Sequence, residues 1–311
     1  MGRRRFNMRS EVCNFDMTRH EDHSYSVAFN PVTQPILSWK DEVYRSARLI
    51  ASMTDKPIYV CMSGGIDSEV AALAFLEQGI PFTAITLRHI QHTNDHEVAY
   101  VMDWCYRNKV QLKFIPIDLT DFFVRKIETY IEQGYIGGTI SYSIYTYLYM
   151  MEVIHALGGS AVMGMGEPVI RNVDGEMKME VIPYRHTVLE YLKNNPDQKH
   201  FPWFFLLTPE ILASYFQEPL VKLFTDDPSY YVSQLPDGIQ SLEKAIVYHK
   251  NFPKMFRRNK GTGWEYFRRT LPTMSSWIGA RHKRYKDTPE AKGIDNHFWI
   301  PITDVKSQLG I

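Results

Sequence analysis

The sequence CMSGGIDS, residues 61–68, follows the apolar run 58–60 and leads into a pattern typical of a helix. Two adjacent glycines after a buried strand permit a sharp turn, because glycine reaches backbone conformations that other residues avoid. Asp67 and Ser68 follow at the start of the helix, where backbone N–H groups and the helix dipole attract anions. The stretch therefore predicts a site for an anion such as phosphate. A strand-to-helix turn without a ligand is the alternative.

Alternating strands and helices extend along the chain around this stretch. Strands are predicted over residues 58–62, 81–87, 112–117 and 161–163. Helices are predicted over residues 39–53, 66–78, 94–108 and 141–157, with apolar side chains at helical spacing. Because helices connect successive strands, we expect a parallel sheet with right-handed crossovers. The predicted fold class is therefore α/β, a doubly wound parallel sheet.

Ligands of such sheets bind beyond the carboxyl ends of the strands, where the winding direction reverses. Three segments are predicted to lie there: residues 61–68, the end of the second strand with Arg88 and His89, and GMGEP at 164–168. We expect these segments to form one site.

Three regions are predicted from the change in pattern along the chain. Residues 1–38 contain several turn-forming residues and little periodicity, so an irregular N-terminal arm is expected. Residues 39–190 carry the alternating pattern and form the predicted nucleotide-binding α/β domain. Residues 191–311 have helical patterns without a second strand–helix alternation, so a mostly helical region that completes the site is expected.

Composition is ordinary for a soluble globular protein: 311 residues, 44% hydrophobic and 23% charged, with a formal net charge of zero. No run approaches the roughly 18 apolar residues that span a membrane, and the N-terminal residues lack the apolar stretch of a secretory signal. Three cysteines are too few for a disulfide framework. We therefore expect a cytoplasmic protein that does not contact a membrane.

A basic stretch lies near the C-terminus. Residues 250–286 contain eleven Lys or Arg and one acid, Glu265. Such a stretch is suited to contact the phosphates of a nucleic acid. A solvated basic face is the equal alternative.

The stretch 61–68 is neither a Walker A loop, which needs GK[ST], nor a GxGxxG fingerprint. It resembles the SGGxDS signature of the PP-loop ATP pyrophosphatases, the adenine nucleotide alpha-hydrolase-like superfamily. The resemblance implies a Rossmann-like, HUP-type fold that uses ATP and Mg²⁺. It also implies a loop that holds pyrophosphate, with Asp67 acting in catalysis and as a magnesium ligand. The implied loop residues are Ser63, Gly64, Gly65, Ile66, Asp67 and Ser68, and the implied adenine contacts are Thr86, Leu87 and Arg88.

The segment AVMGMGEP, residues 161–168, is similar to SGEGADE of the asparagine synthetase branch. Gly164, Gly166 and Glu167 match in kind, but the Ala-Asp-Glu ending is missing. The resemblance makes Glu167 the candidate second magnesium ligand and a candidate catalytic residue, with Asp174 a weaker alternative. A glycine turn with a surface glutamate is the structural alternative.

The segment FRRNKGTGWEYF, residues 256–267, is similar to the late Arg–Lys–Gly region of asparagine synthetase and beta-lactam synthetase. In those enzymes a lysine faces the adenylate and the pyrophosphate. The resemblance makes Lys260 the candidate catalytic lysine, with Arg257 and Arg258 as helpers. A basic surface loop is an equal alternative.

The resemblance as a whole implies an ATP-dependent, AMP-forming ligase. It would adenylate a small-molecule carboxylate with release of pyrophosphate and then form an amide bond, as asparagine synthetase does, without a glutaminase domain. Ammonia, an amine or a separate ammonia-supplying partner would provide the nitrogen. A PP-loop enzyme that modifies tRNA or another nucleic acid, by lysidine formation or thiolation, is the alternative. A non-catalytic ATP-binding protein is the third.

Other side chains carry weaker signals. The spacing of His89, His92 and His96 does not match a known zinc site, so we expect these residues to line a loop. Sulfur-transfer members of the superfamily use a reactive cysteine pair. Cys61 and Cys105, in contrast, are predicted to pack in the interior. The three tyrosines of one helical face are expected in the core: Tyr142, Tyr145 and Tyr149.

Overall fold

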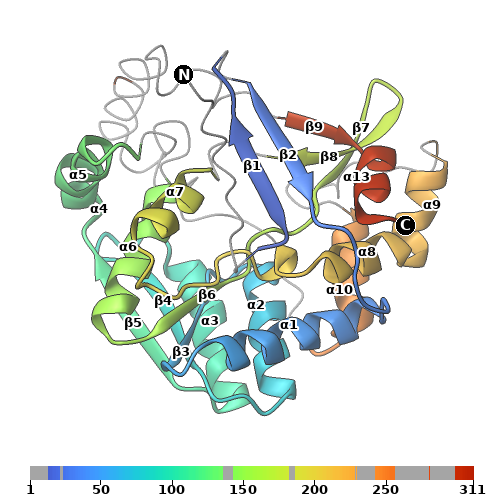
Figure 1. Ribbon diagram of the computed structural model, residues 1–311. Helices are drawn as coiled ribbons and strands as arrows, with labels where there is room; N and C mark the ends of the chain where they lie inside the picture. The colour runs from blue at the N-terminus through green and yellow to red at the C-terminus, as the bar shows by residue number, and fades with distance from the viewer. Residues whose placement is uncertain are drawn as a thin grey trace.

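A four-stranded parallel sheet organises the first half of the computed structural model (Figure 1). The structure describes residues 13–21, 24–135, 143–181, 186–227, 229, 242–255, 280 and 298–311. The strands of the parallel sheet are β3 (Ile58–Cys61), β4 (Thr83–His89), β5 (Leu112–Ile117) and β6 (Ser160–Met163). Their spatial order is β5-β4-β3-β6. The predicted α/β fold class, with a parallel doubly wound sheet, is confirmed.

The strand order places a switch point between β3 and β6. The chain winds outward from β3 through β4 to β5 and then crosses back to add β6 on the other side of β3. Val60 of β3 pairs with Ala84 on one side and Val162 on the other, and all three side chains are fully buried. The crevice at the carboxyl ends of β3 and β6 is therefore where such a sheet binds its ligand.

Helices between the strands lie close to their predicted ranges. They are α1 (Trp39–Met53), α2 (Ile66–Glu77), α3 (Asp95–Asn108) and α6 (Ser143–Ala156). Between β5 and α6 lie three further short elements: α4 (Leu119–Asp121), a π-helical turn (Phe122–Lys126) and α5 (Ile127–Glu132). Helix α1 starts at Ser38, whose hydroxyl accepts a hydrogen bond from the Asp41 N–H. Most side chains of α2 are buried, because the helix lies in the interior.

The N-terminal arm differs from the prediction of an irregular segment. Strands β1 (Phe15–Arg19) and β2 (Tyr25–Phe29) form an antiparallel hairpin. Alternate residues of both strands are buried, and Phe15 packs edge-on against Trp203 at a centroid distance of 5.7 Å. The alternation is a strand signal, but a five-residue strand gives only two or three buried positions to reveal it.

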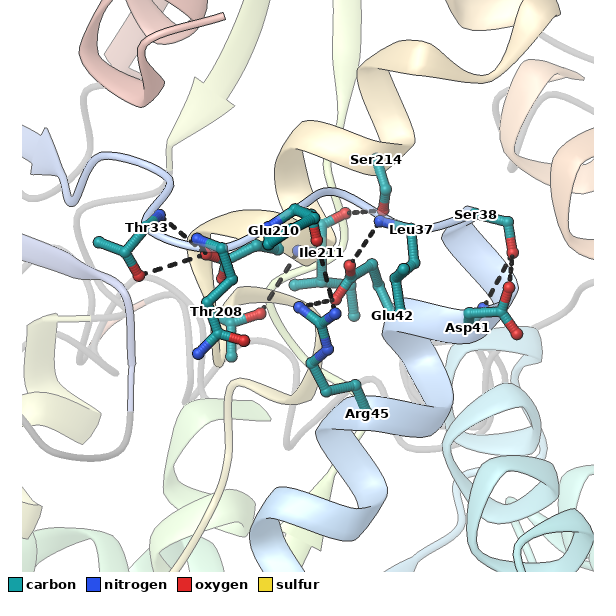
Figure 2. A network of polar contacts seen from close by, with 12 residues as sticks. Thr33, Leu37, Ser38, Asp41, Glu42, Arg45, Thr208, Glu210, Ile211 and Ser214 are labelled. Atoms are coloured by element: carbon teal, nitrogen blue, oxygen red, sulfur yellow. Dashed lines mark hydrogen bonds and ion pairs between the residues drawn. The ribbon is translucent and has the colours of Figure 1, made fainter.

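Residues 33–37 are held against α1 and α8 (Pro209–Gln217) by two buried glutamates (Figure 2). Glu210 accepts hydrogen bonds from the backbone N–H groups of Thr33 and Gln34, each at 3.0 Å. Glu42 accepts one from the N–H of Leu37 at 2.8 Å and lies 3.3 Å from Arg45. These carboxylates satisfy the backbone of an extended segment that has no strand partner to do so.

The described residues after position 190 are mostly helical, and they also contribute a strand to a second sheet. The described helices of this region are α7 (His186–Asn194), a 3₁₀ turn (Phe204–Leu206), α8, α9 (Pro219–Asp226), α10 (Leu242–Asn251) and α13 (Ile302–Leu309). The second sheet is antiparallel, with strands β7 (Ile170–Val173), β8 (Glu176–Val181) and β9 (Phe298–Pro301). Neither β7, β8 nor β9 was predicted. The predicted region boundaries at 38/39 and 190/191 stay predictions.

The hairpin between β7 and β8 changes the interpretation of Asp174. Asp174 and Gly175 both have positive φ, 56° and 85°, and form the turn. The Asn172 side chain accepts a hydrogen bond from the Gly175 N–H. Asp-Gly is a strong hairpin signal, so Asp174 is an exposed turn residue rather than the metal ligand considered above.

Aromatic side chains join α10 to α1 and α8. Trp39 stacks on Tyr248 at 4.8 Å and contacts Tyr215 edge-on at 6.0 Å. Phe205 also stacks on Trp39. These rings are almost fully buried, so the cluster fixes where α10 lies relative to the N-terminal end of α2. Among the described helices, none is long and apolar enough to cross a membrane.

Candidate functional site

The loop between β3 and α2 requires glycine at position 64. Gly64 has a φ of 76°, which L-residues rarely adopt, and it is buried. A Cβ at this position would lie 2.8 Å from the backbone carbonyl oxygen of Glu97. The loop is therefore pressed against the start of α3, with no space for a side chain.

Serines close the loop on itself. The hydroxyl of Ser68 accepts a hydrogen bond from the Ser63 N–H at 3.2 Å and donates one to the Gly65 carbonyl at 2.9 Å. Gly65 is the N-cap residue of α2 and has no side chain to accept the first N–H groups of the helix. The positive end of the α2 dipole is thus directed at the loop, which suits an anion.

The GMGEP segment packs directly on the start of α2. A Cβ at Gly164 would lie 2.7 Å from the carbonyl carbon and oxygen of Asp67. Gly166 has a φ of 86° and lies against Leu206. The predicted neighbours, the SGGIDS loop and residues 164–168, therefore meet at the switch point of the sheet.

Lys244, which the sequence analysis did not single out, completes this cluster. Its Nζ lies 2.7 Å from Oδ1 and 2.9 Å from Oδ2 of Asp67, and 3.9 Å from Oε1 of Glu167. The residue is only 7% exposed. It belongs to α10, which an ordinary amphipathic pattern predicts, and no local motif distinguishes a buried lysine from a surface one.

Tyr248 lies one helical turn after Lys244 and is fully buried. Burial and then the negative charge of Asp67 raise the pKa of the Tyr248 phenol well above its ordinary value. The Lys244 ammonium lies 5.7 Å from the centroid of its ring. The neutral phenol ring therefore adds a cation–π contact to the ion pair between Lys244 and Asp67.

Lys260, Arg257 and Arg258 lie outside the residues that the structure describes. The same holds for most of the basic stretch 250–286. The role of Lys260 and the contact of this stretch with nucleic acid therefore stay predictions.

The predicted adenine-binding residues lie at the end of β4, beside β3. Thr86 is buried, Leu87 is half-buried and Arg88 is exposed. Arg88 forms a salt bridge with Asp95 at 3.3 Å. Asn94 is the N-cap residue of α3, but its side chain donates to the Leu87 carbonyl and accepts from the His89 N–H instead of capping the helix. This connection leads directly into the part of α3 that contacts Gly64.

The histidines near this connection do not gather around a common point. Burial lowers the pKa of His89 to about 4, and its Nδ1 lies 2.6 Å from the Thr93 hydroxyl. His92 pairs with Asp95 at 2.8 Å. Within the described part of the chain, no group of three or more His, Cys, Asp or Glu is arranged to hold a metal.

All three cysteines of the sequence lie in the described residues, and none forms a disulfide. Cys13 and Cys105 are buried, and Cys61 is packed against the core at the end of β3. Burial raises the pKa of the Cys61 thiol and raises the pKa of Cys105 to about 12. A thiol nucleophile requires the opposite shift, because the thiolate is the reactive form.

An apolar pocket adjoins the cluster on the side of Glu167. It lies between the β1–β2 hairpin, strand β8 and the GMGEP segment. Glu167 and Glu180 are its acidic lining residues, and Trp203 closes one wall. The other lining residues are Phe15, Met17, Val27, Phe29, Gly166, Pro168, Met179, Val181 and Leu206. Glu167 lies 3.9 Å from Lys244, so this residue belongs to both the pocket and the cluster.

The carboxylates of Asp67 and Glu167 fit a divalent cation. They already share one positive group, the Lys244 ammonium, which marks a position of negative potential. Carboxylate oxygens are the ligands that Mg²⁺ prefers in proteins. Asp67, with both oxygens directed at the cationic group, would be the principal ligand.

Comparison with known proteins agrees with this geometry. The profile of the tRNA methyl transferase HUP domain matches residues 56–140, which contain β3, α2, β4, α3 and β5. The SGGIDS loop lies within the matched range. Residues 56–140 are a PP-loop domain of the ATP pyrophosphatase superfamily. The resemblance inferred from this loop is confirmed at the level of the superfamily.

Curated relatives match about a quarter of the chain. The tRNA-specific 2-thiouridylase MnmA of Acetivibrio thermocellus is 30% identical over 97 residues, covering 28% of this chain and 27% of the relative. That of Syntrophomonas wolfei is 32% identical over 81 residues, covering 26% and 22%. The chain thus spans about a quarter of the length of the curated relatives it matches.

Solved structures similar to the chain include an NMN synthetase from Francisella tularensis, with a TM-score of 0.35 and 12% identity. An NH₃-dependent NAD synthetase from Campylobacter jejuni has a TM-score of 0.34 and 14% identity. Each alignment covers 82% of this chain and 97% of the other. Likenesses of this size establish neither a shared fold nor a shared activity.

Proposed function

We propose that this protein is an ATP-dependent enzyme that activates an acceptor oxygen by transferring AMP to it. The acceptor oxygen attacks the α-phosphorus of ATP, the bond to the β-phosphate oxygen breaks, and pyrophosphate leaves. The single observation that carries the proposal is the PP-loop at residues 63–68, closed by Ser68 at the start of α2 and bordered by the buried Lys244.

Each part of the cluster has a role in this proposal. The backbone N–H groups and dipole of α2 bind the pyrophosphate portion. Asp67 and Glu167 would hold Mg²⁺, which neutralises charge on departing phosphates when it is bound. Lys244 adds a mobile positive charge within reach of the same anion. Preorganised positive groups of this kind stabilise the charge that develops on the leaving group.

For the acceptor, we propose a tRNA or another nucleic acid, activated at a base carbonyl oxygen. The match of residues 56–140 to a tRNA methyl transferase HUP domain, and of about a quarter of the chain to tRNA 2-thiouridylases, supports this alternative over an asparagine synthetase-like ligase. We propose that the reacting group lies near Glu167, which lines the small apolar pocket and also lies 3.9 Å from Lys244.

The nucleophile that displaces AMP is proposed to come from outside this chain. Cys13 and Cys105 are buried, and the pKa values of Cys61 and Cys105 are raised, so a relay through a cysteine pair is not supported. This observation keeps amide formation on a small carboxylate, with ammonia or an amine as nucleophile, as the second candidate function.

The experiment measures pyrophosphate and AMP released from ATP and Mg²⁺ with three acceptor pools: total tRNA, small carboxylates with ammonia, and no acceptor. We expect release with tRNA and its loss in Asp67→Asn, since that change removes the carboxylate beside the loop. Release with the carboxylates alone would favour the ligase. No release with either pool would contradict the enzymatic proposal and leave an ATP-binding protein.

A further inference from the structure

Lys244 lies where a divalent cation would lie. Its Nζ is within 3 Å of both carboxylate oxygens of Asp67 and 3.9 Å from Glu167. Asp67 is the residue through which the PP-loop would hold a metal. The Asp67 carboxylate would therefore have to serve both the ammonium and the metal.

Because the ion pair is buried, breaking it costs more free energy than breaking an exposed pair would. Lys244 is 7% exposed, and its side chain leaves little room for water around the ammonium. A buried ammonium needs its carboxylates, because an unpaired charge in the interior is strongly unfavourable. A divalent cation held by the same carboxylate would repel the ammonium, because two positive charges would then lie close together in a partly buried site.

We propose that Lys244 and the divalent cation compete for Asp67. Without nucleotide, the ammonium holds Asp67 and Glu167 in place and prevents the metal from binding alone. When metal and nucleotide arrive together, the ammonium exchanges its carboxylates for the phosphate oxygens of the nucleotide. Lys244 thus links α10 to the loop and alternates between the carboxylates and the phosphates. The inference rests on the proposed function only in that Asp67 is a metal ligand.

The test is metal affinity without ATP, measured by electron paramagnetic resonance of free Mn²⁺. We expect wild-type protein to bind Mn²⁺ weakly and Lys244→Met to bind it at least about tenfold more tightly, since the competing charge is gone. Lys244→Arg keeps the charge and should remain weak. If Lys244→Met does not fold, Lys244→Gln removes the same charge and is measured in its place.

Lys250→Met is the matched control. Lys250 belongs to the same helix and pairs with Glu218 at 2.8 Å, but this pair is not part of the cluster. Its loss should leave Mn²⁺ affinity unchanged.

Two results would overturn the proposal. One is an Mn²⁺ affinity of folded Lys244→Met equal to or weaker than that of wild type. The other is a gain that persists in the Asp67→Asn, Lys244→Met double variant, because the gained site would then lie elsewhere. Neither result depends on turnover, so a failure here is distinct from a failure of the proposed enzymatic activity.

Discussion

Gly64 combines two constraints that are usually separate. It has a left-handed backbone conformation, and its missing Cβ allows the Glu97 backbone to approach. Gly79 has a similar φ of 64°, but no atom lies within 4 Å of a Cβ placed there. The two glycines therefore allow the conformational and steric contributions to be measured apart.

We expect Gly64→Ala to lower the free energy of unfolding by about 2–3 kcal/mol, and Gly79→Ala by only about 1 kcal/mol, because only the first also forces the loop away from α3. Gly64→Ala should also weaken ATP binding. Urea denaturation and nucleotide titration check both values. Equal losses of stability in the two variants would show that the close approach to Glu97 is unimportant.

At the scale of elements, the segment at 33–37 depends on buried carboxylates (Figure 2). Glu42 is fully buried, and burial raises the pKa of its carboxyl above the ordinary value, although the Leu37 N–H and Arg45 oppose the shift. Between the unfolded and folded pKa values, the folded protein binds more protons than the unfolded chain. The contribution of Glu42 to stability therefore falls as pH rises through this window.

We expect Glu42→Gln to remove this part of the pH dependence. From pH 4 to a pH about two units higher, the free energy of unfolding should decrease more for wild type than for the variant. The reason is that glutamine does not titrate. Urea denaturation across this range makes the comparison. Parallel curves for the two proteins would contradict the raised pKa.

Helix α10 illustrates how one element serves packing and chemistry together. Tyr248 fixes the helix through its stack on Trp39, and Lys244, one turn earlier, reaches the loop. Positions i and i+4 lie on the same side of a helix, so packing of the aromatic ring also directs the lysine. A change in the aromatic cluster is therefore expected to alter the site through the position of α10.

On the scale of the whole molecule, the net charge is zero but the basic residues are concentrated at 250–286. If this stretch contacts a nucleic acid, binding releases counterions and depends steeply on salt.

We expect the affinity for tRNA to fall by at least about tenfold between 50 and 200 mM salt, because several phosphates are neutralised. Filter binding at increasing salt gives the slope. Replacing Lys254 and Arg281 by glutamine should reduce the slope of the salt dependence. Lys109→Gln and Lys113→Gln, outside the stretch, should leave the slope unchanged. Weak binding without salt dependence would exclude the basic stretch as a nucleic-acid contact.

The loop, strands and helices of the parallel sheet were predictable because the sequence signals for each lie within a few residues of one another. The SGGIDS loop, the parallel strands and the helices between them follow from glycines, caps and apolar periodicity, and residues 61–68 and 164–168 meet as expected. The β1–β2 hairpin was missed because its strands are short, although Asp174-Gly175 shows that the β7–β8 turn did carry a readable signal.

The sequence by itself determined the α/β fold, the position of the SGGIDS loop and the superfamily, since each depends on neighbouring residues. Only the tertiary structure decided that Lys244 pairs with Asp67 across 177 residues of chain and that β9 joins β8. A buried lysine carries no local mark, because its helix has the same pattern whether the side chain points to solvent or to a carboxylate. What places the ammonium is the packing of α10 on Trp39, and packing between distant segments is a property of the whole fold.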